Sequence, residues 1–179
     1  MGGGLIEMYG VDMARIFVST YEKYNNGRII GQWVDLADYS DKNEFLKACY
    51  SLNADEGDPE LMFQDFEDVP EGMASESHIS PEIWDYMALS ESDQEIFSLY
   101  RKYIDETGDI PQALESYLGE YSSKEEWAEE WLEESGILDQ VPECLRYHID
   151  FSSFARDAQL GGDVYFTSDS GVTHVFRNS

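Results

Sequence analysis

The segment SSKEEWAEEWLEESG, residues 122–136, decides how the second half of the chain folds. At 100° per residue its apolar side chains fall within one arc of about 140°, and these are Trp127, Ala128, Trp131 and Leu132. The opposite half of the wheel holds only glutamates, namely Glu125, Glu126, Glu129, Glu130, Glu133 and Glu134. Ser122 and Ser123 each precede a glutamate by three residues, which is typical of a capping box, and Gly136 is placed to end the helix. The segment therefore predicts an amphipathic helix with one wholly acidic face.

This acidic face weakens the helix that carries it. Its four i,i+4 glutamate pairs each cost roughly 0.2–0.5 kcal/mol, and Glu133 and Glu134 lie where the helix dipole favours cations. Six carboxylates over ten residues give one charge per about 2.5 Å of helix axis, compared with about 1.7 Å for duplex DNA. A charge run is usually a solvated face, but solvated faces normally mix signs. The pattern leaves two interpretations, a solvated face and a surface of phosphate-like charge density.

The charge of the whole chain is strongly negative and unevenly distributed. Its 179 residues carry a net charge of −27, yet 42% are hydrophobic, which is typical of a folded protein rather than of an acidic disordered tail. Residues 48–100 contain fourteen Asp or Glu and no Lys or Arg, and residues 103–145 contain thirteen against one Lys. Such a surface repels nucleic acid and anionic membranes, so we expect neither as a partner. The expected partner is a basic protein.

Several features indicate a cytoplasmic protein. Cys49 and Cys144 are too few for a disulfide framework, and both lie in apolar helical patterns, so we expect both in the core. No stretch is apolar enough to span a membrane, and the first residues do not resemble a signal peptide. Residues 1–12 precede a second possible start at Met13 and are expected to be a leader or an appended extension.

The first part of the chain predicts a small ββαβ domain, residues 13–72. The β-rich runs 15–21 and 28–36 are separated by six residues that include the tight-turn pair Asn26-Gly27, which predicts a hairpin. Ser40 or Asp41 should cap a helix, and residues 61–66 should form a third strand. The acidic loop 53–60 resembles a calcium loop only superficially, because an EF-hand needs Gly at its sixth position and Glu at its twelfth.

The remainder predicts a helical middle domain, residues 73–110, and an α+β domain, residues 111–179. Residues 69–78 are expected to be a boundary loop, followed by helices beginning at Ser80-Pro81 and at a capping box of Ser92 and Glu95. A short helix opens at Pro111 and includes Tyr117 and Leu118, and the acidic helix follows after Gly119. A further helical segment then runs over residues 142–160, where Gly161-Gly162 stops it. Runs 163–167 and 172–177 form a closing hairpin. The expected fold class is α+β.

The sequence contains no constellation that indicates catalysis, a cofactor or a metal. It has no Walker loop, dinucleotide fingerprint, HExxH or GxSxG motif. His78, His148 and His174 are scattered without ligand spacing. Carboxylate pairs occur by chance in so acidic a chain and indicate nothing about glycosidase chemistry. We therefore expect a binding protein rather than an enzyme.

Several segments of the second half form a specific set: LGEY at 118–121, WAEEWLEESG at 127–136, LGGDV at 160–164 and HVF at 174–176, together with a VPE, LR, ID, F and ARD pattern across 141–157. With these segments, residues 15–176 resemble the ArdA-type antirestriction proteins. RIFVSTYEKYNNGRIIGQWVDL is similar to the opening strand, turn and strand of the family. The resemblance is weakest over residues 67–89.

The resemblance implies a protein carried by mobile genetic elements, including those moved by conjugative transfer, that mimics B-form DNA. Such proteins occupy the DNA-binding groove of type I restriction-modification enzymes, which the specificity and methyltransferase subunits form. The family's three small domains make a curved rod, which homodimers lengthen. The antirestriction motif maps here onto residues 142–157, near the expected dimer contact.

Two sets of site residues are expected: carboxylates that mimic phosphates, and residues of the dimer contact and antirestriction motif. The expected phosphate-mimicking carboxylates are Glu95, Asp105, Glu106, Asp109, Glu115, Glu120, Glu125, Glu126, Glu129, Glu130, Glu133, Glu134 and Asp139. The expected dimer and motif residues are Glu143, Leu145, Arg146, Tyr147, Ile149, Asp150, Phe151, Phe154, Arg156 and Asp157. No catalytic or metal-binding residue is expected.

Other protein classes compete with a DNA mimic. They are a cation-binding acidic protein, a salt-adapted enzyme, and an acidic binding protein or chaperone for another basic DNA-binding protein. A halophilic composition would spread acids over the whole chain, whereas residues 13–47 hold five acids and five bases. A chaperone differs from a DNA mimic only in its partner, so competition with duplex DNA for a type I enzyme separates the two.

Overall fold

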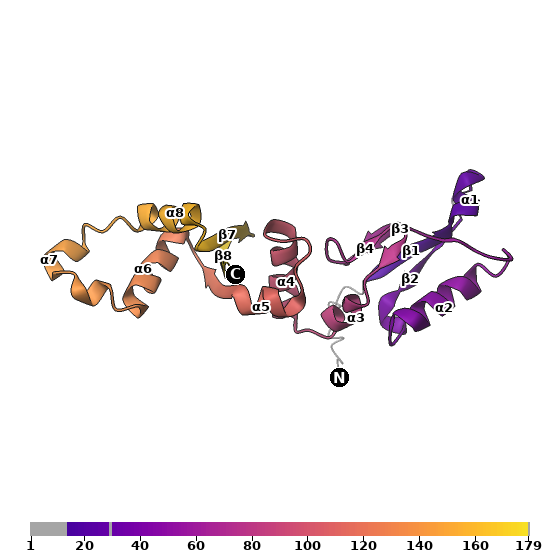
Figure 1. Cartoon of the computed structure of the whole chain (residues 1–179), viewed down its shortest axis with the longest axis horizontal. Helices are drawn as coiled ribbons and strands as arrows, with labels where there is room; N and C mark the ends of the chain where they lie inside the picture. Colours follow the sequence, from indigo (N-terminus) through magenta and orange to yellow (C-terminus); the bar gives the residue numbers. More distant parts are fainter. Residues whose placement is uncertain (1–13, 29, 179) are drawn as a thin grey trace, which may run out of the picture. The chain divides into compact units, whose positions relative to one another are not determined.

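The computed structural model describes residues 14–28 and 30–178. Its helices and strands are intermixed along the chain, which confirms the α+β class (Figure 1). The chain divides into two compact units, the first ending at Ser98 and the second beginning at Leu99. The division into three domains and their arrangement as a rod stay predictions. The leader expected at residues 1–12 lies outside the described residues.

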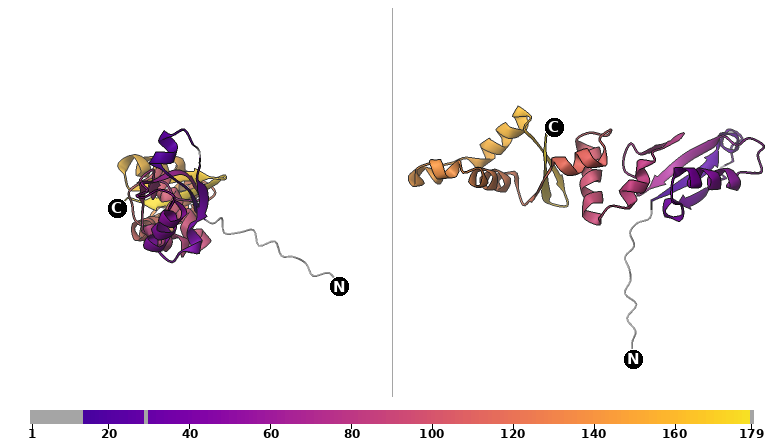
Figure 2. Two further views of the ribbon diagram at one scale, coloured as in Figure 1. Left: turned by 90° about the vertical axis from the view of Figure 1, so that its right-hand side faces the viewer. Right: turned by 60° about the horizontal axis from the view of Figure 1, so that its bottom comes forward.

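The first unit contains the expected ββαβ arrangement. Strands β1 (Arg15–Thr20), β2 (Gln32–Asp35) and β3 (Leu61–Glu67) form an antiparallel sheet in the order β2-β1-β3. After a 3-10 turn, η1 (Leu36–Asp38), helix α2 (Lys42–Leu52) begins at its cap Asp41 and lies alongside this sheet, as Figures 1 and 2 show. The ring of Phe45 on α2 lies 6.2 Å from that of Phe63 on β3, so the core of the unit lies between helix and sheet.

The prediction of a tight turn between the first two strands is wrong. Residues 21–25 instead form a short helix, α1 (Tyr21–Asn25), because the Thr20 hydroxyl caps it by accepting a hydrogen bond from the Lys23 amide at 3.2 Å. Gly27 then has a positive φ of 70°, and pairing resumes only where Gln32 faces Val18. Strands β1 and β2 are antiparallel neighbours as predicted, but a helix and a loop connect them.

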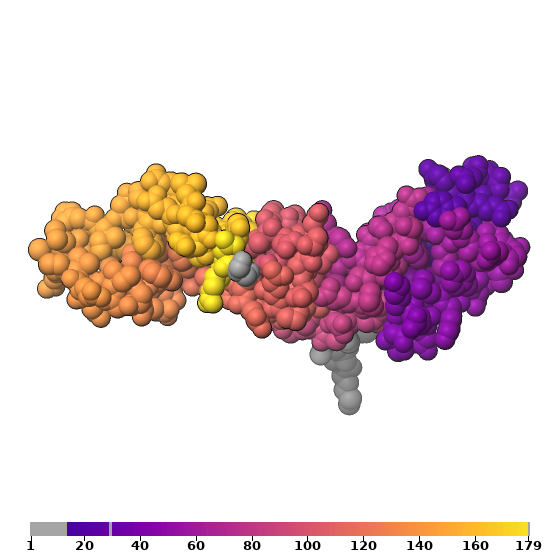
Figure 3. All heavy atoms as spheres, in the orientation of Figure 1, coloured from indigo at the N-terminus to yellow at the C-terminus, as the bar shows by residue number. Residues whose placement is uncertain are grey.

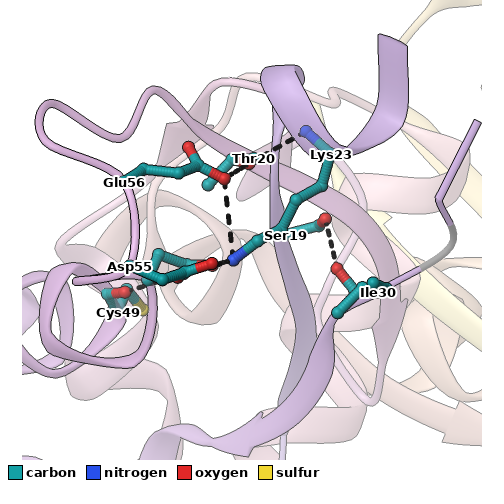
Figure 4. A network of polar contacts seen from close by, with 8 residues as sticks. Ser19, Thr20, Lys23, Ile30, Cys49, Asp55 and Glu56 are labelled. Carbon is teal, nitrogen blue, oxygen red and sulfur yellow. Dashed lines mark hydrogen bonds and ion pairs between the residues drawn. The ribbon is translucent and has the colours of Figure 1, made fainter. Parts of the chain in front are cut away.

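Lys23 pairs with two of the four acids of the loop 53–60, Asp55 and Glu56 (Figure 4). Its Nζ lies 2.9 Å from Asn53 Oδ1, 3.0 Å from Asp55 Oδ1 and 3.6 Å from Glu56 Oε1. The Thr20 hydroxyl donates a further hydrogen bond of 2.6 Å to Glu56. An ammonium group from α1 thus lies among the oxygens that gave this loop its likeness to a calcium loop.

The segment expected to be a boundary loop packs into the first unit. It contains strands β4 (Ala74–Ser75) and β5 (His78–Ile79), which pair with each other, and Met73 is fully buried. The Phe63 amide donates to the Glu76 carbonyl at 2.8 Å. Helix α3 (Glu82–Met87) follows, and the Trp84 indole donates to the Tyr39 carbonyl at 2.9 Å.

Helix α4 (Glu91–Tyr103) begins two residues before the expected position. Ser90, rather than Ser92, caps the helix: its hydroxyl accepts from the Asp93 amide at 3.2 Å and donates to the Asp93 carboxylate at 2.8 Å. The sequence offers Ser-x-x-acid at both positions, so local pattern alone did not distinguish them.

The second unit is built on a three-stranded antiparallel sheet. Asp109 caps α5 (Ile110–Ser116), and residues expected to follow as helix and linker form strand β6 (Tyr117–Tyr121) instead. The closing hairpin, β7 (Val164–Asp169) and β8 (Val172–Arg177), is confirmed, and the strand order is β6-β8-β7. Strand β6 exists because β8 supplies its partner residues, such as Phe176 opposite Tyr117.

Four helical segments separate β6 from β7: α6 (Lys124–Glu134), η2 (Leu138–Gln140), α7 (Glu143–Arg146) and α8 (Phe151–Gly161). The prediction of a single helix from residue 142 is therefore wrong. Asp150 caps a new helix by accepting from the Ser153 amide at 2.9 Å, and Gly162 ends it with a φ of 80°. Cys49 is buried as expected, whereas Cys144, on the four-residue α7, is exposed.

Candidate partner-binding site

Helix α6 has the amphipathic structure that its sequence predicts. Its cap is Ser123, whose hydroxyl accepts from the Glu126 amide at 3.1 Å. Trp127, Ala128 and Leu132 are buried, whereas all six glutamates are exposed. The space-filling view shows this part of the chain (orange) at the surface (Figure 3). The acidic face is therefore available to a partner.

The six glutamates of α6 divide into two groups. The Glu126 carboxylate accepts 2.6 Å hydrogen bonds from the hydroxyl and the amide of Ser122, and these lower its pKa. Glu125 also has a lowered pKa, first through a backbone hydrogen bond and then through the hydroxyls of Ser152 and Ser123. Within the described residues, the other four carboxylates have no side-chain hydrogen bond or ion pair: Glu129, Glu130, Glu133 and Glu134. These four can bind a partner without losing a structural contact.

The glutamates form two rows along the helix. Burial raises the pKa of Tyr121 on β6, and the charges of Glu130, Glu134 and Glu126 raise it further. One row, at positions 126, 130 and 134, therefore lies on the side of α6 that faces β6. The second row, at positions 125, 129 and 133, begins next to Ser152 of α8.

The other expected carboxylates are spread over several elements. Glu95 is exposed on α4 in the first unit, and Glu106, Glu115 and Glu120 are exposed in the second. Three more have structural bonds. Thr107 donates to Asp105 through its hydroxyl and its amide, which lowers the pKa of Asp105. Asp109 caps α5 by accepting from the Gln112 amide at 2.8 Å, and Asp139 lies 3.6 Å from Arg146.

The expected dimer and motif residues also differ in their surroundings. Leu145 and Tyr147 are strongly exposed, at 53% and 86%. Phe151 and Phe154 pack instead against the core cluster of the second unit. Four of the five charged members have intrachain partners, since Arg156 pairs with Asp157 at 3.3 Å, Arg146 with Asp139, and Asp150 caps α8. Glu143 is exposed and Ile149 is half-buried.

The described residues include no group of three or more His, Cys, Asp or Glu side chains that could hold a metal ion. Within the same part of the chain, no helix is both long and apolar enough to span a membrane. The exposed glutamates of α6 lie on a folded scaffold, which suits electrostatic binding of a basic surface.

A protein-family model described as antirestriction protein (ArdA) matches residues 16–173. The chain belongs to the ArdA antirestriction family. A search of curated proteins found no match. The range that matches ArdA contains the whole of α6, both glutamate rows and residues 142–157. The resemblance expected from the sequence is thereby confirmed.

The ArdA chain also has a pocket beside α6 that sequence reasoning did not predict. It has a volume of about 570 Å³. Its lining residues are Leu118, Tyr121, Trp127, Trp131, Glu134, Phe154, Ala158, Asp163, Val164 and Arg177. The available signal was Trp131, one turn after Trp127: the helical period placed it inside the apolar arc, yet it is 42% exposed.

Proposed function

We propose that this protein is a non-enzymatic mimic of B-form DNA that occupies the DNA-binding groove of a type I restriction-modification enzyme. The groove is the one formed by the specificity and methyltransferase subunits. One observation carries the proposal: α6 presents four exposed carboxylates without intrachain partners, in a chain of net charge −27 from an antirestriction family. Lys and Arg side chains that bind phosphates would bind these carboxylates by the same charge-assisted hydrogen bonds.

The proposed action is to block restriction, and modification too, of incoming mobile DNA in the cytoplasm. Nucleic acid and anionic membranes are not expected partners, because a surface of this sign repels them. Binding needs no cofactor or metal. Inhibition should therefore be stoichiometric rather than catalytic.

We also propose a homodimer whose contact lies in residues 142–157. Two copies of so acidic a chain repel each other, so their contact should lie where charges are internally balanced and apolar side chains are exposed. Arg146 and Arg156 are paired within the chain, and Leu145 and Tyr147 are exposed in this region. These features support the dimer proposal.

The decisive experiment is competition between the purified protein and duplex DNA for a type I enzyme across a range of salt concentrations. We expect near-stoichiometric inhibition, displacement of the duplex, and an affinity that falls steeply with salt. An affinity independent of salt, or DNA consumed by the protein itself, would contradict the proposal. Failure to compete with duplex DNA, combined with tight binding to another basic protein, would favour the chaperone alternative.

A further inference from the structure

We propose that the aromatic pocket beside α6, as defined above, receives an arginine side chain of the basic partner. The inference rests on the proposed function, because it takes the partner to be a positively charged DNA-binding groove. All ten lining residues belong to the second unit. The pocket volume of about 570 Å³ is typical of binding pockets and accommodates a long side chain with part of its backbone.

Three aromatic rings form a wall of this pocket. Trp127 and Phe154 have centroids 6.3 Å apart at 25°, and Trp131 and Phe154 have centroids 5.5 Å apart at 31°. The rings are thus roughly parallel, yet their burial differs: Trp127 is 3% exposed and Trp131 is 42% exposed. The stack therefore ends at the surface in Trp131. A planar guanidinium stacks favourably on such an indole face.

Acidic groups stand beside these rings. Glu134 from α6 and Asp163 from the turn before β7 line the pocket, and Glu130 is close enough to raise the pKa of Tyr121. Arg177 is the single base among the ten lining residues. Two carboxylates against one guanidinium leave the lining with a net negative charge. An incoming arginine could therefore donate its forked hydrogen bonds to a carboxylate while its plane lies on Trp131.

The same aromatic core already holds one cation of this chain. Lys124 is the only Lys or Arg in residues 103–145, and its Nζ lies 5.0 Å from the centroid of the Phe166 ring. The Phe166 ring in turn contacts Trp127 edge to face at 5.1 Å. Lys124 also donates to Gln159 at 2.9 Å, and none of the ion pairs found among the described residues includes it. A cation–π contact thus exists on Phe166, a neighbour of the pocket wall, and the pocket offers Trp131 for a second cation.

Other occupants fit this pocket less well. A purely apolar side chain would remove water from Glu134 and Asp163 without replacing its hydrogen bonds. A phosphate or an acidic peptide would meet both carboxylates. Arginine can stack on the rings and donate hydrogen bonds to the carboxylates at the same time. It is also a residue that DNA-binding grooves use to contact phosphates and base edges.

The first test needs no restriction enzyme. The indole N–H resonances of the ¹⁵N-labelled protein would be followed during titration with N-acetyl-arginine methylamide, with N-acetyl-norleucine methylamide as the apolar control. Trp131→Phe assigns the Trp131 signal. We expect the arginine probe, and not the norleucine probe, to shift that signal at millimolar concentrations. Equal shifts with both probes, or none, would overturn the pocket inference even if the protein inhibits the enzyme.

The second test measures binding to a type I enzyme at several salt concentrations. Trp131→Leu keeps the charge, so we expect about tenfold weaker binding with an unchanged salt slope, whereas Trp131→Phe should stay within about threefold. Tyr165→Leu is the matched control, because Tyr165 is 38% exposed in the same unit and does not line the pocket. Near-ultraviolet circular dichroism would establish that each variant is folded.

The outcomes separate the two proposals. Undiminished binding by Trp131→Leu, or an equal loss with Tyr165→Leu, would overturn the arginine pocket. Failure of the unaltered protein to bind the enzyme would instead refute the DNA-mimic proposal, and the probe titration would still decide what the pocket binds.

Discussion

Lys23 is the residue on which the acidic loop of the first unit depends. Its side chain is only 14% exposed, and that of its partner Glu56 is 9% exposed. A carboxylate this deeply buried is costly unless it is paired and hydrogen-bonded, and Lys23 and Thr20 supply both conditions. Loop and helix α1 therefore stabilise each other through one ammonium group.

Replacing Lys23 by methionine should destabilise the first unit. The apolar stem is retained, but Glu56 would lose its counter-charge, and we expect a loss of about 1–3 kcal/mol in the free energy of unfolding. Lys47→Met, on the exposed side of α2, is the control and should change stability by less than about 0.5 kcal/mol. Urea denaturation, with hydrogen exchange of the β1 amides, would measure both. Equal stability of the two variants would show that the network does not stabilise the fold.

At the scale of elements, the first turn of α6 contributes to its folding, whereas its later glutamates are the ones that we propose bind the partner. Its first-turn acids, Glu125 and Glu126, are hydrogen-bonded and lie where the helix dipole favours negative charge. The four later glutamates have neither advantage. Their unfavourable placement is the physical reason for assigning them a role outside folding.

Replacing the four later glutamates should therefore raise stability and weaken binding. Replacing Glu129, Glu130, Glu133 and Glu134 by glutamine removes the i,i+4 repulsions and should raise stability by about 1–2 kcal/mol at low ionic strength, and less in salt. Enzyme binding should weaken and its salt slope should become shallower, because up to four phosphate substitutes are lost. Thermal unfolding and salt-dependent binding would measure the two effects.

A control with the same change in net charge isolates α6. It replaces four exposed acids of the first unit by their amides: Glu22, Asp38, Asp58 and Glu60. The α6 variant should bind the enzyme more weakly than this control. If the two bind equally, overall charge rather than α6 determines affinity.

The cap of α8 should respond to acid in a defined direction. The Ser153 amide, then its hydroxyl and the charge of Arg156, lower the pKa of Asp150 below its ordinary value. A lowered folded-state pKa means that the stabilisation is complete above the unfolded value of about 4 and is lost as the pH falls through the folded value. Hydrogen-exchange protection of α8 should decrease in that range.

Asp150→Asn tests this directly, because asparagine caps helices equally well but does not titrate. The protection of α8 relative to the unaltered protein, compared at each pH, should rise as the solution becomes more acidic. Protonation of the α6 glutamates relieves repulsion in both proteins and cancels in the comparison. A difference that does not vary with pH would show that the Asp150 charge is unimportant.

The elements that could be predicted from sequence are those whose signals are local. Helices α2 and α6 and the closing hairpin combine capping or turn residues with a clear period. Strand β6 was missed because its pairing with β8 joins residues such as Tyr117 and Phe176, far apart in the chain. The break before α8 was missed because an apolar helical pattern continues across Asp150, where the side chain caps a new helix.

The candidate site shows the same difference between local signals and contacts that join distant parts of the chain. The helical period of α6 was enough to predict that its glutamates are exposed. Their division into hydrogen-bonded and partnerless groups depends on contacts with Ser122 and Ser152, and the latter lies on another helix. The aromatic pocket brings together residues from two helices and three strands, so a sequence pattern could not define it.

At the scale of the whole molecule, charge should act in opposite directions on the two proposed associations. Enzyme binding joins opposite charges and should weaken with salt, whereas self-association joins two chains of net charge −27 and should strengthen with salt. Sedimentation and enzyme binding, measured over one salt series, would test this contrast.

Tyr147→Asp should convert the proposed dimer into monomers. Tyr147 is 86% exposed, so the change adds a charge to the expected contact without disturbing the fold of one copy. Tyr24→Asp, at a side chain 56% exposed in the first unit, is the control and should remain dimeric. Sedimentation velocity at micromolar concentration would distinguish the two. A Tyr147→Asp variant that stays dimeric would place the contact elsewhere.

The two cysteines differ in exposure, so a spectroscopic label can be attached to one of them selectively. Burial raises the pKa of the Cys49 thiol to about 12, so at neutral pH it is both shielded and protonated, whereas Cys144 is exposed on α7. A maleimide fluorophore or a nitroxide should therefore label the unaltered sequence at Cys144 alone. In a symmetric pair of copies, the two labels would flank the expected contact, and the distance between them could be measured by pulsed electron resonance without introducing a single mutation.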